Sequence, residues 1–118
     1  MTAMNKRISE IGVVPVIKLN NPECDAIPLA KALCEGGVPV AEVTFRAEMA
    51  IRAMREACPN MLVGAGTVLT KEQVDLSIEA GAQFIVLPGF DAELVTYCQE
   101  KNIPIYPGCT TATDYHTA

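Results

Sequence analysis

The chain has 118 residues, of which 50% are hydrophobic, and its formal net charge is −5. This composition excludes a disordered tail, and an acidic balance without a basic block argues against nucleic acid or an anionic membrane surface as partner. No apolar run approaches the ~20 residues of a membrane span, and the first residues lack a signal-peptide core. We therefore expect a cytoplasmic protein with a single domain over residues 1–118.

The first half of the chain predicts two strand–helix units, in the order strand 12–19, helix 25–37, strand 38–45 and helix 47–58. Pro28 is compatible only with the first turn of its helix, and Gly36 and Gly37 are suited to end that helix. Each helix has one face on which we expect apolar residues at helical spacing to be buried: Ile27, Ala30, Leu33 and Cys34 in the first, and Met49, Ala50, Met54 and Ala57 in the second.

The second half predicts two further units and a final strand, in the order strand 61–66, helix 70–82, strand 83–89, helix 91–102 and strand 103–108. Thr70 and Gln73 have the spacing of a capping box at the start of the third helix, and Gly81 is suited to end it. Asp91 is the expected cap of the fourth helix.

The regular alternation of strands and helices decides the fold class. Near-continuous apolar strands joined by helical crossovers favour an α/β fold with a parallel sheet covered on both faces. Two architectures accept five such strands: a doubly wound sheet, and the first part of a TIM (β/α)₈ barrel. A complete barrel needs at least about 200 residues, so 118 residues predict at most a barrel truncated after about five strands.

Polar residues and glycines gather where the predicted strands end, which in both architectures is the edge that binds ligands. These positions are Lys18, Glu42, Thr44, Arg46, residues 64–67, Pro88, Gly89 and residues 107–111. Glu42 and Arg46 lie four residues apart on one strand and therefore point to the same face. They predict either a structural ion pair, or a carboxylate for proton transfer beside a guanidinium that grips an anion, and the two are compatible.

The run of residues 64–67, Gly-Ala-Gly-Thr, is a poor dinucleotide fingerprint because Leu69 stands where a third glycine is needed. Its glycines predict either a backbone that a small ligand can approach closely, with Thr67 offering a hydroxyl, or a tight turn with positive φ. Lys18 is either a solvated lysine at a strand end or a second cation for an anionic substrate. Pro88 is either part of a turn or a rigid wall beside the ligand.

The cysteines predict neither a disulfide framework nor a metal site. The chain has five of them, an odd number, and no C-x-x-C pair. Four fall in or beside predicted helices, where a reduced cysteine acts as a small apolar residue: Cys24, Cys34, Cys58 and Cys98.

Five blocks in a fixed order carry a resemblance to a known enzyme family: VVPVIK, GGVPVAEVTFR, LVGAGTVLT, EAGAQFIVLPGFD and IPIYPGCTTATD. Over about residues 8–118 the chain resembles the 2-dehydro-3-deoxy-6-phosphogluconate aldolases, also called 4-hydroxy-2-oxoglutarate aldolases. The resemblance implies a (β/α)₈ barrel, usually trimeric, and a class I aldolase of carbohydrate metabolism that needs neither a metal nor a cofactor. In such an enzyme a lysine on the sixth strand forms a Schiff base with pyruvate or the keto acid substrate.

The resemblance also implies roles for the residues that match the family's motifs. Glu42 would move protons through water, and Arg46 would grip the pyruvyl carboxylate. Thr67 and Pro88 would line the pyruvate pocket. Lys18 stands where the family commonly has an arginine that contacts the substrate.

The resemblance implies that the Schiff-base lysine and the phosphate-binding residues of the family would lie beyond position 118. We therefore expect these 118 residues to be nearly inactive alone, and either to self-associate or to belong to a longer chain. Two other interpretations stay open: a non-catalytic folding or assembly module, and a flavodoxin-like binding domain, which a strand order that reverses within the sheet would indicate.

Overall fold

The computed structural model describes residues 3–44 and 48–107, so Arg46, Cys109 and His116 lie outside the described residues. Its five strands form one parallel sheet in the order β1-β2-β3-β4-β5. The strands are β1 (Val16–Ile17), β2 (Val40–Thr44), β3 (Leu62–Gly66), β4 (Phe84–Leu87) and β5 (Ile105–Pro107). Because neighbours in sequence are neighbours in the sheet, the order does not reverse, and the flavodoxin-like alternative is wrong.

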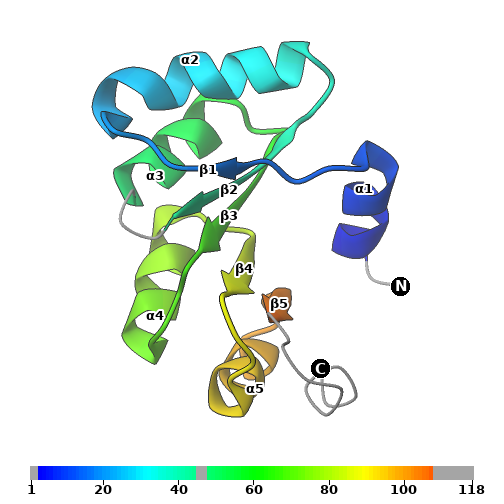
Figure 1. The fold of residues 1–118 in the computed structure, drawn as a ribbon, viewed down its shortest axis with the longest axis vertical. Helices are drawn as coiled ribbons and strands as arrows, with labels where there is room; N and C mark the ends of the chain where they lie inside the picture. Colours follow the sequence, from blue (N-terminus) through cyan, green and yellow to red (C-terminus); the bar gives the residue numbers. More distant parts are fainter. Residues whose placement is uncertain (1–2, 45–47, 108–118) are drawn as a thin grey trace.

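Helices alternate with these strands, as the sequence pattern predicts, and lie along one side of the sheet in Figure 1. They are α2 (Pro22–Glu35), α3 (Glu48–Ala57), α4 (Lys71–Ala80) and α5 (Ala92–Glu100). A further helix, α1 (Ala3–Ile11), precedes the first strand and was not expected. Within the described residues, the helices are too short or too polar to cross a membrane.

The sheet has an apolar cluster on each face. On the helix-covered side, strand residues such as Val43, Val63 and Ile85 pack with the buried faces of the helices. On the opposite side, Val40, Leu62 and Phe84 form a smaller cluster near the beginnings of the strands. Helix α1 covers this smaller cluster with Met4, Ile8 and Ile11, and leaves the ends of the strands uncovered.

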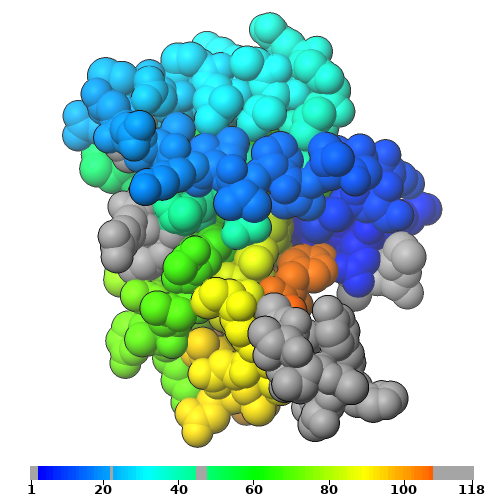
Figure 2. Space-filling view, viewed as in Figure 1, coloured from blue at the N-terminus to red at the C-terminus, as the bar shows by residue number. Residues whose placement is uncertain are grey.

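Helix α1 is held in place by polar contacts at both of its sides. The guanidinium of Arg7 donates a hydrogen bond to the carbonyl of Asn60, which precedes β3, at 3.0 Å. The hydroxyl of Tyr106 on β5 bonds to the side chain of Asn5. Figure 2 shows β5 at the surface beside α1, although the two segments lie at opposite ends of the chain.

Three details of the sequence prediction are wrong. Pro28 lies in the interior of α2, because that helix begins at Pro22 and not at residue 25. Ile27 is 40% exposed, since the buried side of α2 is made by smaller residues, Ala26 and Ala30. Met49 is 63% exposed, and α3 buries Ile51 in its place alongside Ala50 and Met54.

The expected caps are confirmed. Thr70 Oγ1 accepts a hydrogen bond from the backbone N–H of Gln73 at 3.1 Å, and Gln73 Oε1 in turn accepts one from the N–H of Leu69. Gly81 ends α4 with φ of 103°, the left-handed conformation that favours glycine. The carboxylate of Asp91 accepts hydrogen bonds from the first turn of α5.

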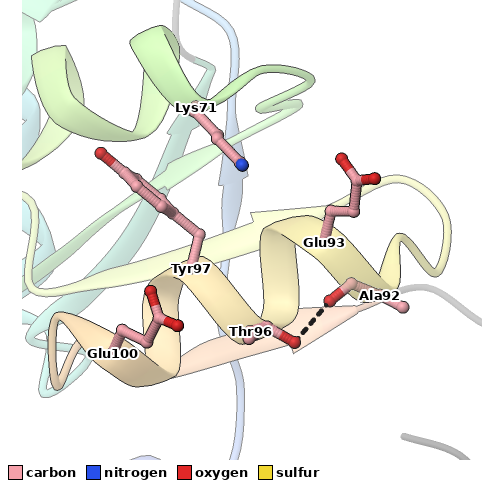
Figure 3. Close-up of a pocket in the computed structure, with 6 residues that line it drawn as sticks. All are labelled: Lys71, Ala92, Glu93, Thr96, Tyr97 and Glu100. Carbon is pink, nitrogen blue, oxygen red and sulfur yellow. Dashed lines mark hydrogen bonds between the residues drawn. The ribbon is translucent and has the colours of Figure 1, made fainter.

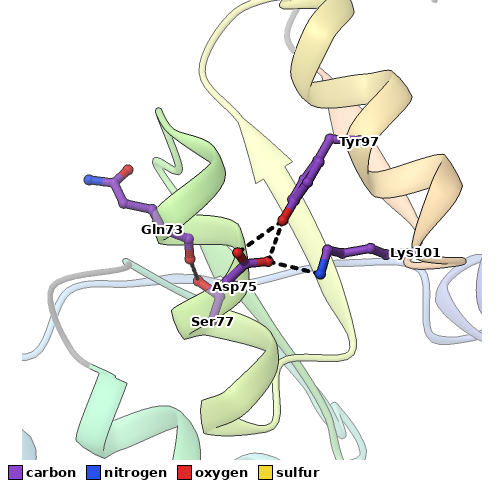
Figure 4. A network of polar contacts seen from close by, with 5 residues as sticks. All are labelled: Gln73, Asp75, Ser77, Tyr97 and Lys101. Atoms are coloured by element: carbon purple, nitrogen blue, oxygen red, sulfur yellow. Dashed lines mark hydrogen bonds and ion pairs between the residues drawn. The ribbon is translucent and has the colours of Figure 1, made fainter.

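Helices α4 and α5 are joined on their outer side by a small polar network (Figure 4). The Tyr97 hydroxyl donates to the Asp75 carboxylate at 2.8 Å, and Lys101 Nζ lies 3.0 Å from the same group. The tyrosine hydroxyl, followed by Lys101, lowers the pKa of Asp75 because both favour its ionised form. The network lies at the surface and links the two helices.

Candidate functional site

Strand β2 presents two polar side chains on the face of the sheet that the helices α2–α5 do not cover. Val43 is buried toward the helices, whereas Glu42 and Thr44 alternate with it and are half-buried on the opposite face. In the sheet register Glu42 lies opposite Gly64 and Thr44 opposite Gly66. The two polar residues therefore stand near the carboxyl edge of the sheet, beyond the apolar cluster that α1 covers.

The Glu42 carboxylate leans across to the neighbouring strand and occupies the space above Gly66. A Cβ placed at position 66 would overlap Glu42 Oε1 and lie 2.9 Å from both Cγ and Cδ of the same side chain. Any side chain at position 66 would thus displace the carboxylate. Because Gly66 has no side chain, the Glu42 side chain can lie against β3. Its carboxylate therefore reaches from a position opposite Gly64 toward Gly66, nearer to the carboxyl edge of the sheet.

The two glycines of β3 have a structural explanation that differs from both sequence interpretations. Neither Gly64 nor Gly66 has a positive φ; the residue that does is Thr67, with φ of 57°. A Cβ at position 64 would overlap the ring of Phe84, which is buried. The glycines therefore make room for Phe84 and Glu42, and the sharp change of direction falls one residue later.

Burial raises the pKa of Glu42 above the ordinary value of a glutamate, because removing the carboxylate from water disfavours its charged form. Among residues 3–44 and 48–107, none donates a hydrogen bond to this carboxylate. A glutamate in such surroundings holds a proton more tightly than one in water, and is correspondingly a stronger base when ionised.

The other predicted site residues follow the strands at the same edge. Lys18 comes directly after β1 and is exposed; it lies one position beyond the Ile17–Val43 pair, level with Thr44. Thr67 and Pro88 directly follow β3 and β4, and both are exposed. Arg46 lies outside the described residues.

A shallow hollow of about 170 Å³ opens between the loops that follow β3 and β4. Its lining residues are Val68, Leu69, Leu87, Pro88, Gly89, Phe90, Asp91 and Leu94. Pro88 is thus part of a concave surface, and Thr67 precedes the segment that forms the opposite wall.

Two larger hollows, of about 330 Å³ each, lie away from this edge. One is on the outer surface of α5, where it is lined by Lys71, Ala92, Glu93, Thr96, Tyr97 and Glu100 (Figure 3). The other lies beside β5 and α1 and is lined by Asn5, Gln99, Asn102, Ile103, Pro104, Ile105 and Tyr106. Neither contains a residue that the sequence singled out, and neither lies at the strand ends where parallel sheets bind ligands. In the described part of the chain, no three His, Cys, Asp or Glu side chains are grouped to hold a metal ion.

The part that Gly66 plays in placing Glu42 was not predicted from the sequence. The signal was present in the alternation of the two strands, because glycines at positions 64 and 66 share one face of β3. A strand with two glycines on one face leaves a groove beside its neighbour. The half-buried acid on β2 fills that groove.

Comparisons with known proteins identify the family of the chain. The family of KDPG and KHG aldolases matches residues 4–118. The 2-dehydro-3-deoxy-phosphogluconate aldolase of Treponema pallidum is 45% identical over all of this chain and 57% of its own length. The chain thus spans just over half the length of this relative.

Two solved structures show the same fold. The 2-keto-3-deoxy-6-phosphogluconate aldolase of Zymomonas mobilis with 3-phosphoglycerate has a TM-score of 0.83 and 38% identity, covering 92% of this chain and 55% of that one. The KDPG aldolase of Legionella pneumophila, with pyruvate captured as a covalent carbinolamine, has a TM-score of 0.81 and 39% identity, covering 88% and 52%. The five parallel strands match part of the aldolase barrel, and the chain belongs to the KDPG and KHG aldolase family.

Proposed function

We propose that the protein to which these residues belong is a class I, Schiff-base aldolase. It cleaves 2-dehydro-3-deoxy-6-phosphogluconate, 4-hydroxy-2-oxoglutarate or both to pyruvate and an aldehyde. The observation that carries the proposal is the Glu42 carboxylate, half-buried over Gly66 at the ligand-binding edge of the sheet, with its pKa raised by burial. The ligands named for the solved relatives, pyruvate as a carbinolamine and 3-phosphoglycerate, support a small keto acid with a phosphorylated substituent as substrate.

The chemistry requires a base that can both accept and return a proton. Once the substrate is bound as an imine, the C4 hydroxyl loses a proton, the C3–C4 bond breaks, and the electron pair moves into an enamine as the aldehyde leaves. The enamine then gains a proton at C3, and hydrolysis of the imine releases pyruvate. Glu42 performs both proton transfers through water, for which its raised pKa suits it.

The remaining residues bind the substrate. Arg46 holds the pyruvyl carboxylate, for which the planar guanidinium offers two parallel donors. Thr67 and Pro88 line the pyruvate pocket, and Lys18 contributes a second positive charge at the mouth. Neither a metal nor a cofactor takes part.

Residues 1–118 form one structural unit in this proposal, the first five βα units of the barrel. The Schiff-base lysine of the family lies beyond position 118, so a chain of these residues alone has little or no activity. The whole protein works in the cytoplasm as a homo-oligomer, as the trimers of the family do. Exposed apolar residues, among them Val13, Val16 and Met49, support association.

Borohydride trapping with pyruvate tests the proposal. The longer protein should gain the mass of a reduced pyruvyl adduct, and a chain of residues 1–118 should not. In the longer protein Glu42→Gln should still be trapped but should cleave substrate about 10²–10⁴ times more slowly, as expected for loss of a general base. Glu56→Gln, an exposed glutamate on α3, is the matched control and should cleave at the unmodified rate. Normal turnover by Glu42→Gln would remove Glu42 from the mechanism.

A further inference from the structure

Helices α2 and α3 lie side by side and run in the same direction (Figure 1). Each carries a cysteine at its carboxyl end: Cys34 is in the last turn of α2, and Cys58 directly follows the last residue of α3. The strands that come next are in register, with Val40 opposite Leu62, so the two helix ends are level with each other. The cysteines are therefore brought together by the parallel arrangement of two successive βα units.

The two side chains lie in the same part of the core. Cys58 lies near enough to Cys34 to raise the pKa of its thiol, after the larger effect of burial, and both cysteines are free. Both residues are half-buried and pack against the main apolar cluster, so the surrounding side chains hold them in place while part of each stays accessible to solvent. Two free cysteines at the level ends of neighbouring helices, packed against the same apolar cluster, are the arrangement that a disulfide between the helices requires.

The other described cysteines cannot compete for either partner. Cys24 lies ten residues before Cys34 in α2, which places it about 15 Å away along the helix axis. Cys98 is buried in α5, which packs against α4 and β5 at the far end of the strand order. The geometry therefore favours one pairing.

We propose that Cys34 and Cys58 are a redox modification site, at which a small-molecule disulfide oxidises them to a reversible crosslink between α2 and α3. One thiol loses its proton, and the thiolate attacks the small disulfide to form a mixed disulfide and release one thiol. The second protein thiolate then attacks the protein sulfur of the mixed disulfide and releases the other thiol. Two protein thiols are oxidised and one small disulfide is reduced to two thiols. This proposal does not depend on the proposed function.

The state of Cys34 sets the rate of this reaction. Burial, and then the neighbouring Cys58, raise the pKa of the Cys34 thiol, so it is protonated at neutral pH. Because the thiolate is the nucleophile, the crosslink should form slowly at pH 7 and about ten times faster for each unit of pH up to the thiol pKa.

The crosslink encloses the strand that carries Glu42. The segment between the two cysteines contains β2 and α3, so oxidation ties the helices on either side of the proposed catalytic strand. A closed loop has fewer unfolded conformations, and the oxidised protein should therefore unfold at a higher urea concentration than the reduced protein.

The test is oxidation of the folded protein with glutathione disulfide, followed by acid quenching and peptide mapping without reduction. We expect a crosslinked peptide pair containing Cys34 and Cys58, and a protein about 2 Da lighter than the reduced form. Cys34→Ser and Cys58→Ser should instead retain a mixed disulfide with glutathione on the remaining partner. Cys24→Ser is the matched control and should form the same crosslink as the unmodified protein.

The outcome that overturns the proposal is defined for the unmodified protein, so it does not depend on how a variant folds. The oxidation is done at about pH 8.5, the pKa of an ordinary thiol, where half of such thiols are ionised. Failure to recover the crosslinked peptide pair at this pH would overturn the proposal. Recovery of a different pairing as the main product would do the same. Equal yields in folded protein and in urea would show that the fold does not direct the pairing.

Discussion

Replacing Gly66 by alanine tests whether the glycine exists to place Glu42. The added methyl would overlap Glu42 Oε1 and lie 2.9 Å from Cγ and Cδ, closer than carbon atoms approach in packed proteins. Relief requires the Glu42 side chain to leave the surface of β3, since the backbone of Gly66 is held in the ladder with β2, opposite Thr44. The expected consequences are a loss of stability and a misplaced carboxylate.

The magnitude follows from two opposing effects. Adding a methyl group where there is no space costs about 1–3 kcal/mol. Alanine in a strand is about 0.5–1 kcal/mol better than glycine, because the unfolded chain has less freedom to lose. The overlap wins, and we expect Gly66→Ala to lower the free energy of unfolding by roughly 0.5–2 kcal/mol. In the longer protein, displacement of the carboxylate by about 1 Å should lower turnover about 10²-fold.

Urea unfolding followed by circular dichroism measures the stability change, and a double-mutant cycle identifies its cause. In a Glu42→Ala background the methyl at position 66 meets no carboxylate, so Gly66→Ala should become neutral or slightly stabilising. Gly89→Ala is the matched control, since a Cβ there would have no neighbour within 4 Å, and it should change stability by less than about 0.5 kcal/mol. An equal cost of Gly66→Ala in both backgrounds would refute the steric explanation.

Three further predictions use the same measurements. Because burial raises the pKa of Glu42 in the folded protein, its ionisation lowers stability as pH rises above the ordinary glutamate pKa of about 4.3. Glu42→Gln should therefore be more stable than the unmodified protein at pH 7 and equally stable at pH 3. A stability difference that does not vary with pH would contradict this prediction. Asp91→Ala removes the cap of α5 and should lower the free energy of unfolding by about 0.5–2 kcal/mol, a loss that Asp91→Asn should largely restore. Because the pKa of Asp75 is lowered, its contact with Tyr97 and Lys101 stabilises the protein above the ordinary aspartate pKa, and this stabilisation is lost as pH falls through the lowered pKa. Asp75→Asn should therefore make stability less sensitive to acid. An unchanged dependence of stability on pH would show that the network contributes nothing.

The order and type of the elements from β1 to β5 follow from the sequence because the relevant signals are local. Short runs rich in Val and Ile, helical spacing between them, and caps such as Thr70 and Asp91 are each visible within a few residues. The limits of the first and last strands were less accurate. Strand β1 was expected over 12–19, but only Val16 and Ile17 pair, because a strand is defined by its neighbours and β1 has one neighbour in the described residues.

Helix α1 could have been predicted from the sequence. Met4, Ile8 and Ile11 lie at the i, i+4, i+7 spacing of an amphipathic helix. Met49 was wrongly assigned to the buried face of α3 for a different reason: Met49 and Ile51 are both apolar, and only the packing against α2 and α4 decides between them.

The site could be predicted only in part. The alternation of β2 places Glu42 and Thr44 on one face, and this is a property of the strand alone. The position of the carboxylate over Gly66 depends on the register between β2 and β3, which joins residues more than twenty positions apart and has no local signal. The roles of Arg46, Thr67, Pro88 and Lys18 stay predictions.

The contact between Asn5 and Tyr106 joins residues 101 positions apart in the chain, and it has a consequence for the order of events during synthesis. Helix α1 leaves the ribosome before the sheet does, and the surface that its apolar side chains cover includes Phe84 and Tyr106. At a synthesis rate of about 5–20 residues per second, roughly 5–20 s pass between the synthesis of α1 and the completion of that surface. A helix of 9 residues is only marginally stable alone in water, so α1 should form on the sheet and not before it. A segment made before the sheet is therefore ordered only after the sheet.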